Sequence, residues 1–308
     1  MPYSTGKAAP QMFEAVKQFG KLVKMMSTGD PVERTRRLYQ FMPPSFEFVE
    51  RTTTYCNFGY WNDGVTSLDE AAEEMATKLA DAAGIQSGDT VLDLGFGYGD
   101  QDFSWLRNRQ PKKIHGLNIT PHQIEHARSR ATKEGVADKL DFQQGSATDI
   151  PFPDNTFDRV VALESAFHFY PRSDFFKEAF RVLRPGGVLA VADVLPTNDD
   201  VVRKELKSRA LSWILISYDE ANWYTADTYT KQLGEAGFEQ ARVDSIRDRV
   251  WEQYRQFMVN RLASPSFKAK VNSTSYKGMA RNWSDQDLLK KELAGIDYVM
   301  AVAHKPAE

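Results

Sequence analysis

The segment 91–99, with the sequence VLDLGFGYG, limits the possible folds more than any other part of this chain. An apolar strand ends near an acid, Asp93, and three glycines follow at alternate positions, Gly95, Gly97 and Gly99. Glycine lets the main chain approach a ligand without obstruction by a Cβ atom, and the helix that follows offers unpaired amides to an anionic group. The pattern therefore predicts an α/β fold with a nucleotide-like ligand at this turn.

The spacing of the glycines argues against a dinucleotide as that ligand. A dinucleotide-binding turn places its third glycine where this chain has Asp100. Because a carboxylate there would repel a pyrophosphate, NAD and FAD are disfavoured. A tight turn that needs glycine for its geometry alone would explain one glycine more easily than three in alternation.

Short apolar segments alternate with helical patterns from residue 90 onward, which is typical of a parallel sheet. We expect strands at residues 90–94, 113–118, 140–144, 157–163, 187–194, 239–246 and 298–304. Two segments interrupt the alternation, at about 196–226 and 250–295, and we interpret them as insertions that act as lids. Residues 1–66 are expected to form a helical cap with an aromatic loop, and residues 67–308 the main domain.

Helix boundaries are signalled at two places. Ser67 and Glu70 form a capping-box pattern at the start of a helix, and Gly84 lies where that helix would end. A second helix is expected after Asn118, with Thr120 as N-cap, Pro121 in the first turn and Gln123 completing a box. Helical spacing of apolar residues between positions 13 and 26 predicts an amphipathic packing helix.

Composition narrows the class of protein. Forty-two acidic residues against 39 basic ones give a net charge of -3, so no bulk attraction to nucleic acid or to a membrane surface is expected. The single cysteine, Cys56, excludes an intramolecular disulfide framework and a cysteine-rich zinc site, and we expect no metal. Because no run is apolar enough for a secretory signal or a membrane span, a cytoplasmic protein is expected, with its oligomeric state open.

Further motifs follow the glycine turn in a fixed order. The segment 145–152, GSATDIPF, comes after the third strand, and LRPGG at 183–187 precedes the fifth. Together with the acid and the GxGxG turn, they resemble the class I S-adenosylmethionine (SAM) dependent methyltransferases. The chain is most similar to small-molecule O-methyltransferases of natural-product biosynthesis, of the kind that methylates a sugar on a macrolide. This resemblance implies a Rossmann-like sheet of seven strands whose last hairpin is antiparallel.

The resemblance also implies positions that bind SAM. Asp93 would accept from the methionine ammonium or brace the loop, while the three glycines present main chain to the ligand. Tyr60 and Trp61 would close over the sulfonium, since aromatic faces favour a cation. The other implied positions are Asn118, Ile119, Gln123, Ser146, Ala147 and Glu164, with Ser146 and Ala147 beside the adenine. Asn118 stands where many members have an acid for the ribose hydroxyls, which indicates weaker or different ribose recognition.

Methylation of a hydroxyl requires alignment of the acceptor and removal of one proton. His168 is the candidate base, because it follows the fourth strand at the edge where open α/β sheets place their sites. A histidine is largely neutral at cytoplasmic pH and can take a proton. The ordinary alternative is a histidine buried in the core. The position of His168 after the fourth strand and the resemblance to the methyltransferase family outweigh that alternative. Asp193, near the end of the fifth strand, would orient His168 or the acceptor, or else bond only to nearby backbone.

Six aromatic residues are expected to form an apolar acceptor cavity, although each alone is more often a core residue. They are Phe58, Phe167, Phe169, Trp213, Trp223 and Tyr224. The leading hypothesis is methyl transfer to a hydroxyl of a bulky, largely apolar natural product. One alternative is C-methylation of an isoprenoid alkene such as a prenyl diphosphate, where aromatic faces would stabilise a carbocation and Arg34, Arg36, Arg37 or Arg51 would hold the diphosphate. Another is a protein that binds SAM without catalysis.

Overall fold

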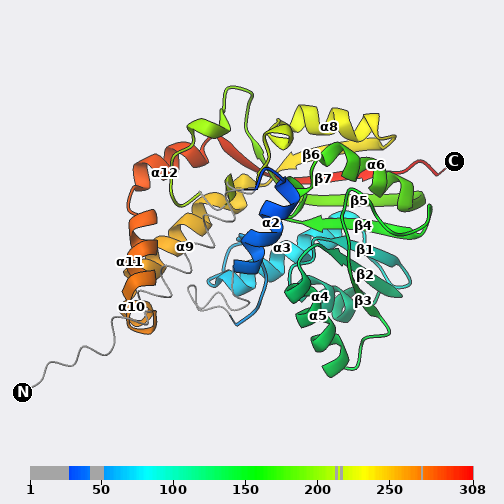
Figure 1. Cartoon of the computed structure of the whole chain (residues 1–308), viewed down its shortest axis with the longest axis horizontal. Coiled ribbons are helices and arrows are strands. Elements are labelled where there is room, and N and C mark those ends of the chain that lie inside the picture. The colour runs from blue at the N-terminus through cyan, green and yellow to red at the C-terminus, as the bar shows by residue number, and fades with distance from the viewer. Residues whose placement is uncertain (1–27, 42–51, 212–213, 216–217, 272, 308) are drawn as a thin grey trace, which may run out of the picture.

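A seven-stranded sheet forms the centre of the molecule (Figure 1), in a computed structural model that describes residues 28–41, 52–211, 214–215, 218–271 and 273–307. The strand order is β3-β2-β1-β4-β5-β7-β6. The strands are β1 (Thr90–Leu94), β2 (Lys113–Asn118), β3 (Leu140–Gln144), β4 (Phe157–Leu163), β5 (Leu183–Pro196), β6 (Glu239–Ser245) and β7 (Ile296–His304). Strands β1 to β5 are parallel, and β7 is antiparallel to both β5 and β6. The predicted fold class, with its antiparallel last hairpin, is confirmed.

The first four strands begin and end at the predicted residues, whereas β5 is longer than predicted. It covers Leu183–Pro196 rather than 187–194 because its start pairs with β4, at Phe157, and its end pairs with β7. Side chains alternate between the two faces of the sheet, so Val91 and Leu92 belong to different apolar clusters. Both faces are therefore buried, as expected for a parallel sheet.

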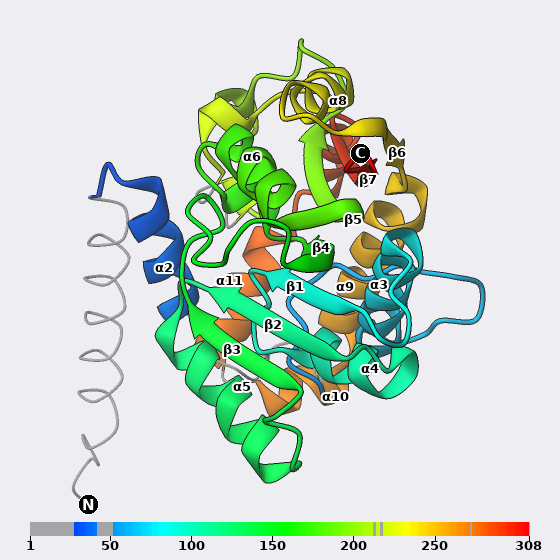
Figure 2. The ribbon, with the colours of Figure 1, turned by 90° about the vertical axis from the view of Figure 1, so that its right-hand side faces the viewer.

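Helices cover both faces of this sheet (Figure 2). On one face pack α3 (Leu68–Ala83), α4 (Asp100–Arg109) and α5 (Pro121–Lys133), and on the other pack α6 (Arg172–Val182) and α8 (Ala226–Glu235). The helix α2 (Pro31–Phe41) lies against the turn η2 (Ala166–His168), which follows β4. The carboxyl edge of the parallel strands is thus covered by a helix that comes from the other end of the sequence.

The capping predictions are partly confirmed. Ser67 and Glu70 form the capping box, and Gly84 ends α3 in the left-handed conformation. Thr120 and Pro121 begin α5 as predicted, but Gln123 does not complete a box with Thr120. Its Oε1 accepts instead from Asn118 Nδ2 at 3.0 Å, because Asn118 lies beside it at the end of β2.

The insertions contain short helices. Residues 196–226 include η3 (Arg203–Glu205) and η4 (Glu220–Asn222). After η5 (Arg247–Arg249) come α9 (Trp251–Ala263), α10 (Pro265–Lys270), α11 (Ser273–Asn282) and α12 (Gln286–Leu293), which Figure 1 shows to one side of the strands. That these insertions act as lids stays a prediction, and the helix predicted at 13–26 lies outside the described residues. No helix in the described part of the chain has the length and apolar character to cross a membrane.

Candidate active site

The turn after β1 requires glycine. Gly95 has a φ of 78° and Gly97 a φ of 57°, values that side chains disfavour. A Cβ atom on Gly95 would lie 2.5 Å from the Cβ of Ser165, which belongs to the turn after β4. The two turns can approach each other only because Gly95 has no side chain.

A cavity opens beside this turn. Its walls include Gly95 and Gly97, the end of β2 with Asn118 and Ile119, and Gln123 of α5. The carboxyl ends of β1, β2 and β4 therefore meet at one cavity, as the sequence predicts.

The remainder of the predicted cofactor set divides between the cavity and the interior. Ser146, Ala147 and Glu164 line the cavity. Gly99 caps α4 with a left-handed backbone, behind the lining residues. Asp93 is completely buried beneath the glycine turn.

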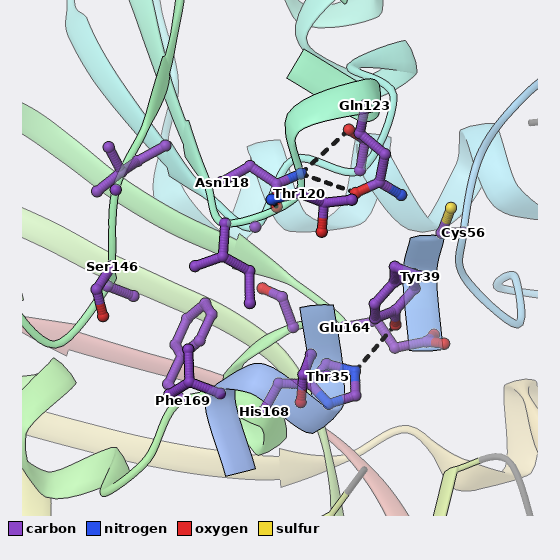
Figure 3. Close-up of a pocket in the computed structure, with 18 of the residues that line it drawn as sticks. Thr35, Tyr39, Cys56, Asn118, Thr120, Gln123, Ser146, Glu164, His168 and Phe169 are labelled. Atoms are coloured by element: carbon purple, nitrogen blue, oxygen red, sulfur yellow. Dashed lines mark hydrogen bonds between the residues drawn. The ribbon is translucent and has the colours of Figure 1, made fainter. Parts of the chain in front are cut away.

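Asn118 is held by the protein itself. Its Nδ2 lies 3.3 Å from the carbonyl oxygen of Gly97 and 3.0 Å from Gln123 Oε1, and its Oδ1 accepts from the amide of Thr120. Figure 3 shows Asn118 and Gln123 bonded at the upper wall of the cavity. Asn118 thus joins the glycine turn to α5. This bracing role was not expected from the sequence, where Asn118 was noted only because many family members have an acid at this position.

Asp93 shares its burial with a second acid, Asp102 of α4. Gln101 donates to Asp93 Oδ2 at 2.9 Å. Asp93 Oδ1 and both oxygens of Asp102 have no partner outside this pair among the described residues, and the two carboxyl groups share a hydrogen bond when one of them is protonated. Burial raises the pKa of Asp93 to about 7, and burial together with the charge of Asp93 raises the pKa of Asp102 well above its usual value. This pair retains a proton at neutral pH.

Glu164 joins three parts of the chain at the cavity wall. Its Oε2 accepts from the amide of Phe58 at 3.0 Å and from the hydroxyl of Tyr298 at 2.7 Å. Its backbone has a φ of 51°, a left-handed conformation that is rare for residues with a side chain and often occurs at functional sites. Glu164 therefore fixes the position of the loop after β4.

His168 lies in that loop, at the cavity wall, and is buried. Its Nε2 is 2.9 Å from the hydroxyl of Tyr39 on α2, as drawn in Figure 3. Phe167 packs on the imidazole with ring centroids 4.0 Å apart. Burial, and the nearby Cys56 and Glu164, raise the pKa of Tyr39 well above its usual value, so its phenol stays protonated.

Asp193, expected to orient His168 or the acceptor, is not among the described residues that line the cavity. Asp193 is completely buried and is paired with the guanidinium of Arg172, with 3.3 Å between Oδ2 and Nε. Its Oδ1 accepts from the amide of Val194. A buried carboxylate needs a counter-charge, and Arg172 supplies it. That Asp193 orients the histidine stays a prediction.

Arg172 connects this ion pair to the insertion at 196–226. Its Nη1 donates to the carbonyl oxygen of Asn222, and its Nη2 donates to the hydroxyl of Tyr218. The Nδ2 of Asn222 donates in turn to the carbonyl oxygens of Phe167 and Phe169, on either side of His168. The Asp193–Arg172 pair consequently supports the turn from behind instead of facing the cavity.

Tyr60 and Trp61 do not line the cavity either. Trp61 packs against Phe257 of α9 and donates to the carbonyl oxygen of Phe58, and Tyr60 lies beneath the ammonium of Lys78. Both rings are anchored to neighbouring helices, because the amides of residues 60 and 61 bond to Ala71 and Arg249. A contact of these rings with the sulfonium finds no support in this arrangement.

Of the predicted acceptor residues, Phe169 lines the cavity. Phe58 packs edge-on against Trp251, Tyr254 and Tyr298 in the core. Trp223 and Tyr224 are tied to the insertion and to α8, through bonds to Val201 and Gln232. Their clustering reflects packing of the insertion, and Trp213 lies outside the described residues.

The sequence interpretation missed the contribution of α2. Val32, Thr35 and Tyr39 line the cavity from one face of this helix. Their spacing, three and then four residues, is the helical signal that could have identified them. Nothing in the sequence, however, indicated that this face would lie over the turn after β4.

The cavity fits SAM. Gly95 and Gly97 expose main chain, Ser146 and Ala147 lie at the far end, and the buried hydroxyl of Thr120 has no hydrogen-bond partner in the described part of the chain. A nucleoside with a charged amino-acid tail needs close approach to main chain together with a few polar partners. These residues provide both.

Comparisons with known proteins agree with this fit. Residues 92–191 match the family described as "Methyltransferase domain". The chain is 43% identical to erythromycin 3''-O-methyltransferase of Saccharopolyspora erythraea, across 90% of this chain and 91% of that protein. It is 33% identical to sterol 24-C-methyltransferase ERG6B of Gibberella zeae, across 65% of this chain and 51% of that protein.

Among solved structures, geranyl diphosphate methyltransferase in complex with GPP and sinefungin has a TM-score of 0.66 and 19% identity, across 89% of this chain and 99% of that one. This likeness shows the fold. The chain belongs to the class I SAM-dependent methyltransferases, and it is an enzyme that uses S-adenosyl-L-methionine.

Proposed function

We propose that this enzyme transfers a methyl group to a hydroxyl of a bulky, largely apolar natural product, such as a sugar hydroxyl on a macrolide, with His168 as general base. SAM, when bound, supplies a methyl group already activated for displacement. The observation that carries the proposal is the position of His168, a buried histidine in the wall of the cavity that also exposes the glycine turn. The protein must then orient the acceptor and accept its proton.

The hydrogen bond with Tyr39 fixes the tautomer of His168. Because the phenol of Tyr39 stays protonated, it is the donor across the 2.9 Å contact, and His168 Nε2 is the acceptor. Because Tyr39 occupies the one lone pair of Nε2, the proton of an acceptor hydroxyl reaches the imidazole by one of two routes. Either Tyr39 passes its own proton to Nε2 as it takes the proton of the acceptor, or the acceptor hydroxyl replaces that of Tyr39 at Nε2. Phe167 holds the ring in place from behind.

The character of the cavity wall supports a neutral, apolar acceptor. Leu163, Phe169 and Val32 contribute to it, and no arginine or lysine is among the described residues that line it. Arg36 and Arg37, proposed from the sequence as a possible diphosphate site, are both bonded at 2.6 Å to Glu33 on their own helix. The relative named for 3''-O-methylation of erythromycin indicates the same acceptor class.

C-methylation of an isoprenoid is the second candidate. Glu164 favours it, because a carboxylate in an apolar wall would stabilise a carbocation formed at an alkene. The similarity to a sterol C-methyltransferase points the same way. The wall described above suits an uncharged isoprenoid better than a prenyl diphosphate.

Product analysis separates the two candidates. Purified enzyme is incubated with isotopically labelled SAM and an acceptor panel that contains 3''-O-demethylerythromycin, other hydroxylated polyketides, a sterol and geranyl diphosphate. Mass spectrometry is expected to find the label in a methyl ether on a hydroxylated acceptor. Label bound to carbon of the sterol or the diphosphate, without any ether product, would contradict the proposal and favour the second candidate.

A further inference from the structure

Thr35 presents a buried hydroxyl to the cavity. Its side chain is 3% exposed, it lines the cavity, and its Oγ1 has no hydrogen-bond partner among the described residues. A threonine in a helix ordinarily bonds to a carbonyl oxygen one turn earlier, and burial of a hydroxyl without a partner is unfavourable. An unpartnered hydroxyl at a cavity wall is therefore suited to a polar atom of a ligand.

We propose that Thr35 binds a second oxygen of the methyl acceptor, close to the hydroxyl that is methylated, and so selects acceptors with neighbouring oxygens, as in a sugar. This inference rests on the proposed function. It assigns acceptor recognition to α2, a helix that covers the carboxyl edge of the sheet from the N-terminal part of the chain.

The geometry of α2 places this hydroxyl next to the proposed base. Thr35 and Tyr39 are four residues apart on one helix, so their side chains lie on the same face, roughly 6 Å apart along the axis. The hydroxyl of Tyr39 is 2.9 Å from His168 Nε2. Figure 3 shows Thr35 and Tyr39 directed from α2 toward His168. An acceptor oxygen next to the Tyr39 hydroxyl and His168 therefore has Thr35 within one helical turn.

A second unpartnered hydroxyl helps to separate the two ligands. Thr120 is also buried and lines the cavity, but it begins α5, where its amide bonds to Asn118 beside the glycine turn. That position belongs to the cofactor end of the cavity. Thr35, on the helix that contacts His168, belongs to the acceptor end.

The chemistry of the group fits a polyhydroxylated acceptor. A threonine hydroxyl can both donate and accept, so it can bind a hydroxyl or an ether oxygen. Around it, the polar groups of Tyr39 and Glu164 already bond to protein atoms, namely His168 Nε2 and the amide of Phe58. A further oxygen on the acceptor would thus be satisfied by Thr35.

The test compares Thr35→Val, which keeps the shape and removes the hydroxyl, with Thr35→Ser, which keeps the hydroxyl. The acceptors are the hydroxylated panel member with the highest kcat/KM, starting from 3''-O-demethylerythromycin, and its analogue with the neighbouring oxygen replaced by hydrogen. Acceptor affinity is measured by calorimetry on enzyme saturated with S-adenosylhomocysteine, and cofactor affinity is measured separately. Thr120→Val serves as the matched control at the cofactor end.

Thr35→Val is expected to weaken binding of the oxygen-bearing acceptor about tenfold, and Thr35→Ser about threefold at most. Neither Thr35 variant should change the affinity for the deoxygenated analogue or for SAM. Thr120→Val, in contrast, should weaken the binding of SAM. Equal losses for both acceptors, no loss for either, or a loss of SAM affinity in Thr35→Val would overturn the assignment of Thr35 alone. If the wild-type enzyme forms no ether with any hydroxylated acceptor, the proposed function fails, and this assignment fails with it.

Discussion

The two ends of the cavity are built in different ways. The cofactor end comes from consecutive strands and turns, with Gly95, Gly97 and Asn118 placed by β1 and β2. The acceptor end combines Thr35 and Tyr39 of α2 with the turn after β4, which lies well over a hundred residues later in the chain. The first end depends on local backbone geometry, and the second on contacts between distant segments. Substitutions at the two ends should therefore affect different measurements.

The largest expected effect is at the acceptor end. His168→Ala should lower kcat by about 10²- to 10⁴-fold, the usual contribution of a general base, and leave the Kd of SAM within about twofold. Steady-state kinetics and calorimetry check the two quantities. His122→Ala is the control, because His122 lies on α5 and bonds to Tyr98 rather than to Tyr39. Turnover that is unchanged in His168→Ala would remove the base from the proposal.

A substitution in the glycine turn should have the opposite signature. Gly95→Ala is expected to weaken the binding of SAM at least thirtyfold. The new Cβ would lie 2.5 Å from the Cβ of Ser165, and the backbone φ at this position is 78°. Gly88→Ala is the control: Gly88 also has a positive φ, 91°, but a Cβ there meets nothing within 4 Å. Calorimetry with SAM checks both variants. Equal SAM affinity in Gly95→Ala and the wild type would show that the turn is not the cofactor site.

The smallest effect concerns the buried acids under that turn. Because the folded pKa of Asp93 is about 7 against an ordinary value of 3.8, the folded state retains protons that the unfolded chain releases above that lower value. Its contribution to stability is therefore greatest at low pH and is lost as pH rises from about 4 to about 7, with the linked Asp102 extending the loss to higher pH.

Asp102→Asn removes one of these two acids and keeps a donor for Asp93. The slope of unfolding free energy against pH should become less negative, by at most about 1.4 kcal/mol per pH unit, and the variant should exceed the wild type in stability at pH 8. Urea unfolding at several pH values between 5 and 8 measures this slope. Parallel curves for the two proteins would contradict a shared proton at this site.

Most of the sheet could be predicted from the sequence, because its strands are short apolar runs bounded by turns. The glycine turn could also be predicted, since three glycines in alternation have a local backbone reason. His168 could be placed at the cavity because it follows β4 directly. These features depend on residues that are close together in the chain.

The features that were missed depend on packing between distant segments. The sequence gives no sign that Arg172 would neutralise Asp193, or that Tyr60 and Trp61 would be anchored by backbone bonds to α3 and to Arg249. Nor does the sequence indicate that Asn222, next to Trp223 and Tyr224, would bond to the backbone on either side of His168. Only tertiary structure distinguishes an aromatic residue in a cavity from one beneath its floor.

The position of β7 has a consequence for how the chain reaches its final form. This strand is the seventh in sequence but lies inside the sheet, between β5 and β6. During synthesis, β6 has no neighbour to pair with until residues 296–304 have left the ribosome. Closure of that side of the sheet must therefore wait for translation to pass β7, and a chain cut before residue 296 would leave two strand edges exposed to aggregation.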